Sequence, residues 1–162
     1  MAYQYNSCLL YTSDMTFNAA KVISAWKYDG IYSFYDKNGE TEGFTDGNHY
    51  ACKDSEGGLM GFFCFGEDGQ IPTLEENVYQ PGYLDIGLGL KPDLCGKGYG
   101  IEFIKAGLNF AKEQLKAEKI RLSVATFNER ARKAYKKAGF TVSSEVTNSR
   151  FNNKFYIMVM SL

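Results

Sequence analysis

The chain has 162 residues, of which 44% are hydrophobic and 23% are charged, and its formal net charge at pH 7 is −1. A chain of this length can form one domain with a buried core, and the near-zero charge argues against broad electrostatic attraction to nucleic acid or to membranes. No apolar run approaches the ~20 residues that a membrane-spanning helix requires.

The first third of the chain indicates a strand, a helix and an aromatic segment. A strand is expected at residues 8–11, followed by a helix that Asp14 or Thr16 can cap and that runs to about Trp26. The next stretch, KYDGIYSFYD, is dense in aromatic residues and is broken by Gly30. We expect it to form either a second short helix or a loop.

The middle of the chain has the pattern of a hairpin followed by a buried strand. Two short, partly alternating apolar runs, HYACKD and LMGFFCFG, flank the turn signal SEGG. The polar stretch EDGQIPTLEENVYQPG then leads as a loop into YLDIGLGL. The apolar character of YLDIGLGL predicts a strand that is buried on both faces.

Helical and strand periodicities alternate in the second half. Apolar residues three or four apart predict an amphipathic helix; they are Ile101, Ile104, Leu108, Ala111 and Leu115. The stretch KIRLSVAT alternates like a strand, and NERARKAYKKAGF predicts a helix that Asn128 caps and Gly139 ends. FTVSSEV and KFYIMVM predict a last hairpin. We therefore expect residues 1–162 to form a single domain, a mixed α/β sheet with helices on its faces.

A glycine-rich turn, Gly96-Lys97-Gly98-Tyr99-Gly100, lies between the predicted buried strand and the amphipathic helix. Glycines permit a tight turn there, and the free N–H groups of a helix N-terminus bind anions, so we expect a phosphate site. A P-loop is excluded, because Gly98 stands where that motif requires Ser or Thr. A dinucleotide fingerprint is disfavoured, because the spacing is GxGxG rather than GxGxxG and comes late in the chain.

Two blocks of the sequence resemble the GNAT N-acetyltransferase superfamily. The acetyl-CoA loop of that family reads Arg or Gln, two residues, Gly, one residue, then Gly or Ala, and residues 95–100 fit it except at Cys95. VATFNERARKAYKKAGF is similar to the second conserved block, with Asn128, Ala131 and Tyr135 ahead of Gly139-Phe140. Together the two blocks cover roughly residues 83–140.

The resemblance implies the GNAT acyl-CoA N-acyltransferase fold, a central, mostly antiparallel sheet with one splayed pair of parallel strands and helices on both faces. The splayed strands would be Leu84–Leu90 and residues 120–125, with the pantetheine arm of coenzyme A between them. The pyrophosphate would lie on the amides of the glycine-rich turn. The positions implied to bind this cofactor are Leu88, Gly89, Leu90, Cys95, Gly96, Lys97, Gly98, Tyr99, Gly100, Asn128 and Arg130.

The 3′-phosphate of the cofactor would meet one of three cations on the last predicted helix, Arg130, Arg132 or Lys133. A solvated cationic face is an equally good interpretation of these residues.

The resemblance further implies that an acetyl group passes from acetyl-CoA to a primary amine by direct attack in a ternary complex. Tyr135 would give a proton to the departing thiolate; its alternative role is to pack on the core. Asp85 is the candidate base, although strand alternation points it away from its neighbours, and a buried structural hydrogen-bonding role is the alternative. More distant candidates flank the expected acceptor site: Glu75, Glu76 and His49.

Aromatic residues ahead of the first hairpin would form one wall of the acceptor site. We expect Trp26, Tyr28 and Tyr32 to bind the substrate, with core packing as the alternative. The acceptor is then a small-molecule amine or a peptide, and neither nucleic acid nor a membrane is an expected partner. The resemblance also allows a homodimer, since dimers are common among relatives.

Metals and location can be judged from the same sequence. The one histidine, His49, lies three residues before Cys52, but no second ligand pair accompanies them, so no metal is expected. The first residues show no basic start followed by an apolar run, and the four cysteines form no CxxC pair. We therefore expect a cytoplasmic protein with reduced thiols. Two other functions stay open: a non-catalytic acyl-CoA binding or sensing module of the same fold, and a nucleotide-binding protein.

Overall fold

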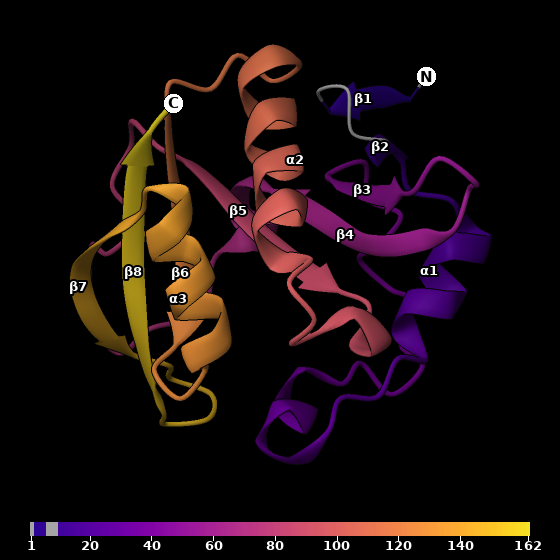
Figure 1. Ribbon diagram of the computed structural model, residues 1–162. Coiled ribbons are helices and arrows are strands. Elements are labelled where there is room, and N and C mark those ends of the chain that lie inside the picture. The colour runs from indigo at the N-terminus through magenta and orange to yellow at the C-terminus, as the bar shows by residue number, and fades with distance from the viewer. Residues whose placement is uncertain (1, 6–9) are drawn as a thin grey trace.

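The computed structural model describes residues 2–5 and 10–162, with the side chains of residues 3–5 excluded. In this part of the chain one sheet has eight strands in the order β1-β2-β3-β4-β5-β6-β8-β7 (Figure 1). They are β1 (Tyr3–Tyr5), β2 (Leu10–Asp14), β3 (His49–Lys53), β4 (Leu59–Phe65), β5 (Leu84–Leu90), β6 (Lys119–Ala125), β7 (Thr141–Thr147) and β8 (Lys154–Ser161). Neighbouring strands are antiparallel except for β5 and β6, which are parallel. The predicted fold class is confirmed.

Three α-helices and three short 3₁₀ helices accompany the described strands. They are α1 (Phe17–Ser24), α2 (Gly100–Glu113), α3 (Glu129–Ala138), η1 (Gly30–Tyr35), η2 (Gly66–Gly69) and η3 (Pro92–Leu94). Thr16 begins α1, because its side-chain oxygen accepts a hydrogen bond from the Ala19 N–H at 3.1 Å. The helix stops short of Trp26, and the aromatic segment forms η1. None of the described helices has both the length and the apolar character needed to span a bilayer.

The strand expected at residues 8–11 corresponds to β2, which begins at Leu10. The part of that prediction that falls on residues 8 and 9 lies outside the described residues. The hairpin of β3 and β4, strand β6 and the final hairpin of β7 and β8 are confirmed at the predicted places.

Helices α2 and α3 cover the front face of the sheet, which is the face toward the viewer in Figure 1. Aromatic rings stack across this contact: Phe63 of β4 lies on Phe103 of α2 with ring centroids 4.6 Å apart, and Phe65 lies on Phe110 at 5.9 Å. Gly107 allows this approach, because a Cβ there would lie 2.6 Å from the Phe63 ring. The larger part of the core therefore lies between the sheet and these two helices.

The back face is covered mostly by irregular chain. Residues 15–46, which contain α1 and η1, and residues 66–83, which contain η2, pack there, and we call them together the back layer. Phe62 of β4 contacts the cluster that includes Ile23 and Phe44, and the buried back-face residues of β6, β7 and β8 contact both segments. Helices on both faces were predicted, and α1 provides the one on this side.

Strand β5 is less buried than its sequence predicts. Asp85 and Ile86 are only 3% and 1% exposed, but residues 87–90 are half-buried. The reason is that β5 leaves β6 soon after its start, so that one edge of the strand stays open. The prediction of burial on both faces is therefore wrong for residues 87–90.

Replacing Gly107 by Ala should lower the free energy of unfolding by about 1–3 kcal/mol, because the new methyl group meets the Phe63 ring in a packed core. Alanine is the better helix former by about 1 kcal/mol, so a helix without this contact would gain stability instead. Lys112→Ala, on the exposed side of α2, is the matched control and should be neutral. Urea unfolding measures both, and a raised midpoint for Gly107→Ala would contradict the packing.

Candidate active site

The parallel strands β5 and β6 are joined only at their beginnings. Their pairing consists of two rungs, of which Asp85 with Arg121 is the last. Beyond this rung β5 continues to Leu90 along β4, and β6 continues to Ala125 along β8. We call the unpaired stretch between these two arms the fork. The splayed pair of parallel strands implied by the sequence is therefore present.

The edge of β5 that faces the fork offers backbone groups to a ligand. The Lys91 N–H donates to the Met60 carbonyl at 2.8 Å, which fixes the direction of the backbone there. Alternation along the strand turns the backbone groups of Leu88 and Leu90 toward the fork and those of Gly89 toward β4. The Leu90 carbonyl already accepts a side-chain hydrogen bond, whereas nothing in the described chain bonds to Leu88 on this side. Of the three predicted edge residues, Leu88 is best placed to pair with an extended ligand.

The glycine-rich turn exposes a run of backbone N–H groups. Gly96 and Gly98 have φ of 72° and 88°, a left-handed conformation that disfavours other residues. Within the described residues, no acceptor bonds the N–H groups of residues 96–102, and the first hydrogen bond of α2 runs from Phe103 to the Tyr99 carbonyl. Apart from its own chain neighbours, no atom of the described residues would lie within 4 Å of a Cβ on Gly98. Open amides at the start of a helix are the arrangement that binds anions.

Cys95 stands at the one position where the sequence departs from the family pattern. Its Sγ lies 3.6 Å from the Lys91 carbonyl and 3.7 Å from the Leu90 carbonyl, so it braces the entry to the turn. Burial raises the pKa of the thiol, which therefore adds no negative charge beside a phosphate. Lys97 is exposed, and Tyr99, 46% exposed, precedes α2 as its N-cap residue.

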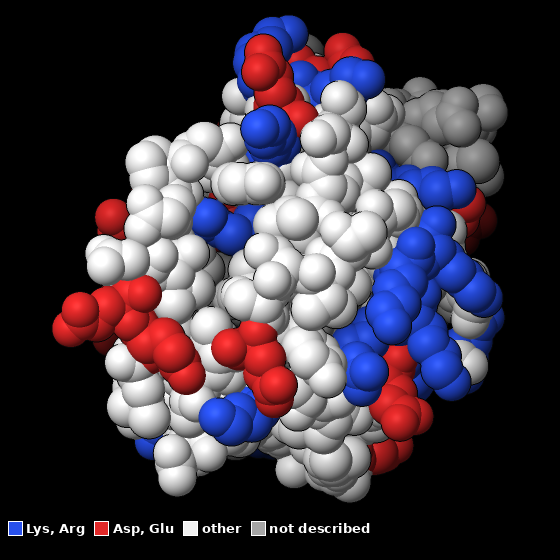
Figure 2. Space-filling model, turned by 90° about the vertical axis from the view of Figure 1, so that its left-hand side faces the viewer, with Lys and Arg blue, Asp and Glu red and all other residues white. Residues whose placement is uncertain are grey.

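Arg130 of α3 brings a cation to the glycine-rich turn. Its guanidinium lies over the Tyr32 ring, 4.0 Å from the centroid, and its Nη1 would be 3.4 Å from a Cβ on Gly96. Arg132 is engaged elsewhere, because it donates to the Thr126 carbonyl at 2.7 Å. Lysine and arginine side chains gather on the right-hand side of Figure 2, which is the side of α2 and α3. Positive charge therefore lies on the same side of the sheet as the turn.

Tyr135 and Asn128 stand on α3 beside the β6 arm. Asn128 caps the helix, because its Oδ1 accepts from the Ala131 N–H at 3.2 Å, and its Nδ2 donates to the Tyr35 hydroxyl at 3.2 Å. Tyr135 is 7% exposed, and burial raises the pKa of its hydroxyl, as does the nearby Tyr35. Among the described residues no hydrogen-bond partner is found for that hydroxyl. Tyr135 is therefore a neutral donor whose O–H group is available.

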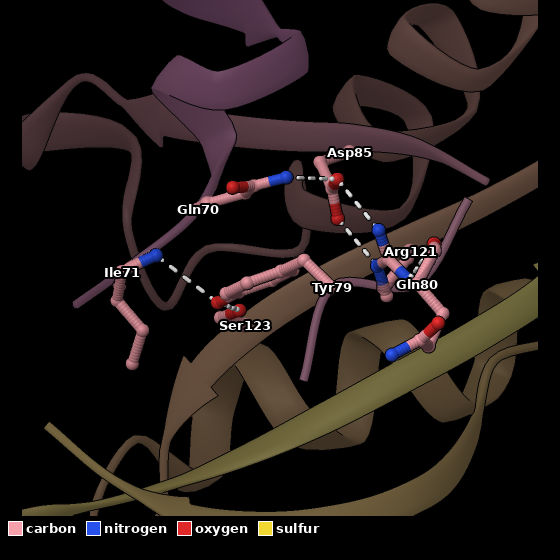
Figure 3. A network of polar contacts seen from close by, with 7 residues as sticks. All are labelled: Gln70, Ile71, Tyr79, Gln80, Asp85, Arg121 and Ser123. Carbon is pink, nitrogen blue, oxygen red and sulfur yellow. Dashed lines mark hydrogen bonds and ion pairs between the residues drawn. The ribbon is translucent and has the colours of Figure 1, made fainter. Parts of the chain in front are cut away.

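The last rung of the parallel pair is a buried ion pair (Figure 3). Arg121 donates from Nε and Nη2 to the two oxygens of Asp85, at 2.6 and 2.9 Å, and these bonds raise the pKa of the guanidinium. Gln70 donates to the same carboxylate at 2.9 Å. Asp85 and Arg121 are only 3% and 4% exposed. Both carboxylate oxygens are engaged by a permanent cation, so we assign Asp85 the structural role and not that of a base.

Arg121 also fastens the back layer to the sheet. Its Nη1 donates to the Gln80 carbonyl at 2.9 Å, and its guanidinium lies 5.1 Å from the centroid of the Tyr79 ring. The Tyr79 hydroxyl is 2.6 Å from Ser123 Oγ on β6 and accepts from the Ile71 N–H at 3.0 Å (Figure 3). The loop after β4 is therefore held against both arms of the fork.

The aromatic segment around η1 crosses the fork on its back side. The Tyr28 hydroxyl donates to the Leu90 carbonyl of the β5 arm at 2.9 Å, while Tyr32 contacts Arg130 on the other arm. Trp26, 9% exposed, lies in a core cluster of the back layer, so it has the packing role. The aromatic density of the sequence identified this segment. It did not predict that Trp26 packs in the core while Tyr28 and Tyr32 contact the two arms.

A further cluster joins His49, one of the predicted distant candidates, to Asp46 and Asp68, which were not predicted. His49 Nδ1 lies 3.1 Å from Asp46 Oδ1 and 4.0 Å from Asp68 Oδ2. Hydrogen bonding between the carboxylates lowers the pKa of Asp46 to about 2 and raises the pKa of Asp68. Among the described residues this is the one group of three side chains with the spacing of metal ligands. Glu75, another candidate base, instead accepts two hydrogen bonds from Thr147.

Comparison with known proteins gives one family and many structural neighbours. A family model described as an acetyltransferase (GNAT) domain matches residues 14–141. Similar solved structures include a chimeric spermidine N-acetyltransferase from Vibrio cholerae, with a TM-score of 0.74 and 17% identity over 94% of this chain and 95% of that chain.

Two further structures have the same fold. One is a GNAT-family acetyltransferase from Bacillus anthracis, with a TM-score of 0.74 and 14% identity over 99% of this chain and 98% of that chain. The other is an aminoglycoside acetyltransferase in complex with coenzyme A, with a TM-score of 0.72 and 19% identity over 94% of each chain. No curated protein matched the sequence. At these identities the structural neighbours establish the fold alone.

Replacing Arg121 by Met should lower the free energy of unfolding by about 3–5 kcal/mol, because the buried Asp85 carboxylate loses its cation. The double replacement Asp85→Leu with Arg121→Met should recover most of that loss, since it removes both charges and keeps the volume filled. Arg150→Met, at an exposed position, is the control. Urea unfolding of the three proteins tests the pair: a double variant that is no more stable than the single one would rule out a coupled ion pair.

Proposed function

This chain belongs to the GNAT acetyltransferase domain family, and on that basis we propose that it is an acetyl-CoA-dependent N-acetyltransferase that acts on a primary amine. The observation that carries the proposal is the run of unbonded amides at residues 96–102, which follows directly after the strand with the open edge. An anion site next to an unpaired strand edge is what the pyrophosphate and pantetheine of coenzyme A require.

Different residues around the fork bind different parts of coenzyme A. The amides of residues 96–102 donate to the pyrophosphate, and Arg130 adds a guanidinium beside the same turn. Leu88 pairs through its backbone with the pantetheine amides. Gly89 is glycine for a packing reason, because a Cβ there would lie 2.3 Å from the Phe62 ring.

The reaction is a direct acyl transfer. The neutral amine nitrogen attacks the thioester carbonyl carbon, a C–N bond forms and the C–S bond breaks. The Leu88 N–H, which points into the fork, polarises the carbonyl oxygen. The departing thiolate takes the proton of Tyr135, which solvent then replaces, and the surplus proton of the amine goes to solvent. Burial suits Tyr135 to this role, because it keeps the phenol protonated until the thiolate forms.

One observation favours a second candidate, a non-catalytic acyl-CoA binding or sensing module of the same fold. The expected base on β5 is lacking, because Asp85 is paired with Arg121 and its neighbours Leu84 and Ile86 are apolar. Both candidates bind coenzyme A, so turnover separates them: release of free thiol in the presence of an amine supports the enzyme.

Gly98→Val should weaken binding of coenzyme A at least about tenfold, because a side chain would stand over the amides and strain a residue with φ of 88°. Gly57→Val is the matched control: Gly57 has φ of 82° and equally open surroundings, but it lies in the turn between β3 and β4. Calorimetric titration with coenzyme A measures both. If the Gly98 variant binds as well as the Gly57 variant, the turn does not hold the cofactor.

Tyr135→Phe should lower kcat by about 10²-fold or more while the Kd for coenzyme A changes little, because only the proton donor is removed. Tyr50→Phe is the control, since Tyr50 packs on Phe65 and Phe110 in the front-face core, away from the proposed reaction. A thiol-release assay gives kcat and calorimetry gives Kd. An unchanged kcat would exclude Tyr135 as the acid.

A further inference from the structure

An amine that enters the fork loses hydrogen bonds to water, and the two arms offer one polar side chain that can replace them. Beyond the last rung, the arms consist of residues 86–90 of β5 and residues 122–125 of β6. Ser123 is the only residue in these ranges with a polar side chain. At the rung itself, Asp85 is already paired with Arg121. Ser123 is therefore the polar group that the arms themselves bring to the proposed reaction.

Ser123 lies on the back face of the sheet, at a place where that face is open. Its neighbours on the same face of β6, Arg121 and Ala125, are 4% and 0% exposed, whereas Ser123 is half-buried. If the parallel pairing continued, Ser123 would lie opposite Gly87. A Cβ on Gly87 would be 2.6 Å from Cys64 Sγ, so the packing behind β5 favours glycine there. The space beside Ser123 therefore receives no side chain from residue 87.

Tyr79 of the back layer fixes the position of the Ser123 hydroxyl (Figure 3). The Tyr79 oxygen accepts from the Ile71 N–H at 3.0 Å and lies 2.6 Å from Ser123 Oγ. Burial raises the pKa of Tyr79, so the phenol keeps its proton and can donate it in a hydrogen bond to Ser123. In the described part of the chain, nothing else bonds to Ser123 Oγ. One lone pair of that oxygen is then available to a ligand.

An available oxygen on this face suits a neutral primary amine. The glycine-rich turn leads into α2 on the front face, which leaves the back face for the acceptor. The amine must direct its lone pair at the thioester carbon, so its N–H groups need acceptors elsewhere. As the C–N bond forms, the nitrogen becomes positive and its N–H groups become stronger donors. A hydrogen bond to Ser123 would therefore strengthen in the transition state.

We infer that Ser123 binds the acceptor nitrogen: its Oγ accepts an N–H hydrogen bond from the attacking amine, and Tyr79 is a positioning residue that holds this oxygen in place. The inference rests on the proposed acetyl transfer and names a residue that orients its acceptor. Ser123 makes and breaks no covalent bond, and the surplus proton of the amine still goes to solvent. The competing role of Ser123 is structural, as a tie between β6 and the loop after β4.

Ser123→Ala tests the inference, because it removes the oxygen without adding bulk. Thiol release is followed at saturating acetyl-CoA with n-butylamine, benzylamine and alanine amide, and the amine that turns over fastest is used for the kinetics. The kcat should fall about tenfold, as expected for one hydrogen bond that is strongest in the transition state. The KM of the amine and the Kd for coenzyme A should change by less than about twofold, because the bond contributes little before the reaction.

Two control variants separate the hydroxyl from the fold. Ser123→Thr keeps the oxygen and should retain most of the activity. Ser144→Ala removes an exposed hydroxyl from β7 and should change neither kcat nor KM. Urea unfolding measures the stability of each variant. If Ser123→Ala is less stable but equally fast, Ser123 has the structural role and the inference is overturned. A Thr variant that is as stable as the wild type but as slow as the Ala variant would also overturn it.

Tyr79→Phe tests the positioning role, because it removes the hydroxyl and keeps the ring that lies on Arg121. If Tyr79 acts through Ser123, this change lowers kcat several-fold in the wild-type protein and has no further effect in Ser123→Ala. Equal effects on kcat in the two backgrounds would show that Tyr79 acts independently, and would overturn its assignment as a positioning residue.

The same assays separate the inference from the proposed function. If the wild-type protein acetylates an amine and Ser123→Ala does so equally fast, the inference alone fails. If the wild-type protein binds coenzyme A but releases no thiol with any of the three amines, the enzyme proposal fails and the inference falls with it.

Discussion

The architecture depends on a parallel strand pair, β5 and β6, that is joined at two rungs and open beyond the second one. The Asp85–Arg121 pair occupies that rung, and it is buried, bidentate and supported by Gln70. Breaking such a pair leaves an uncompensated charge in the core, so the two parallel strands are held together firmly at this point. Because Arg121 also binds the loop that follows β4, the same residue fixes both the start of the fork and the chain that packs behind it.

The fork joins two surfaces of different chemistry. On the front face, the turn of residues 96–102 presents open amides beside cationic helices, and on the back face aromatic and acidic chain covers the strands. A sheet with continuous pairing would keep these surfaces apart. In the proposed reaction, the acyl donor and the acceptor amine would meet at the opening between β5 and β6.

Local sequence patterns were sufficient for the elements and for the turn. Helix caps at Thr16 and Asn128 and left-handed glycines at 96 and 98 are decided by neighbours within a few residues, so they can be read from the chain. The partner of Asp85 could not be predicted, because it lies 36 positions away and meets Asp85 only through the register of two parallel strands. The same holds for Asp46 and Asp68, which the fold brings together from separate segments. The packing role of Trp26 could not be predicted for a different reason. The density of aromatic residues identifies a segment, but it does not tell which of its rings faces the core.

The bridge formed by Tyr28 and Tyr32 has a practical consequence for protein engineering. Tyr28 is bonded to the strand that would carry pantetheine, and Tyr32 supports the arginine beside the glycine-rich turn. Libraries that randomise these tyrosines to alter the proposed acceptor site would therefore disturb the proposed coenzyme A site as well. Diversity is better introduced at residues 37–43, which are mostly exposed and precede the buried Phe44.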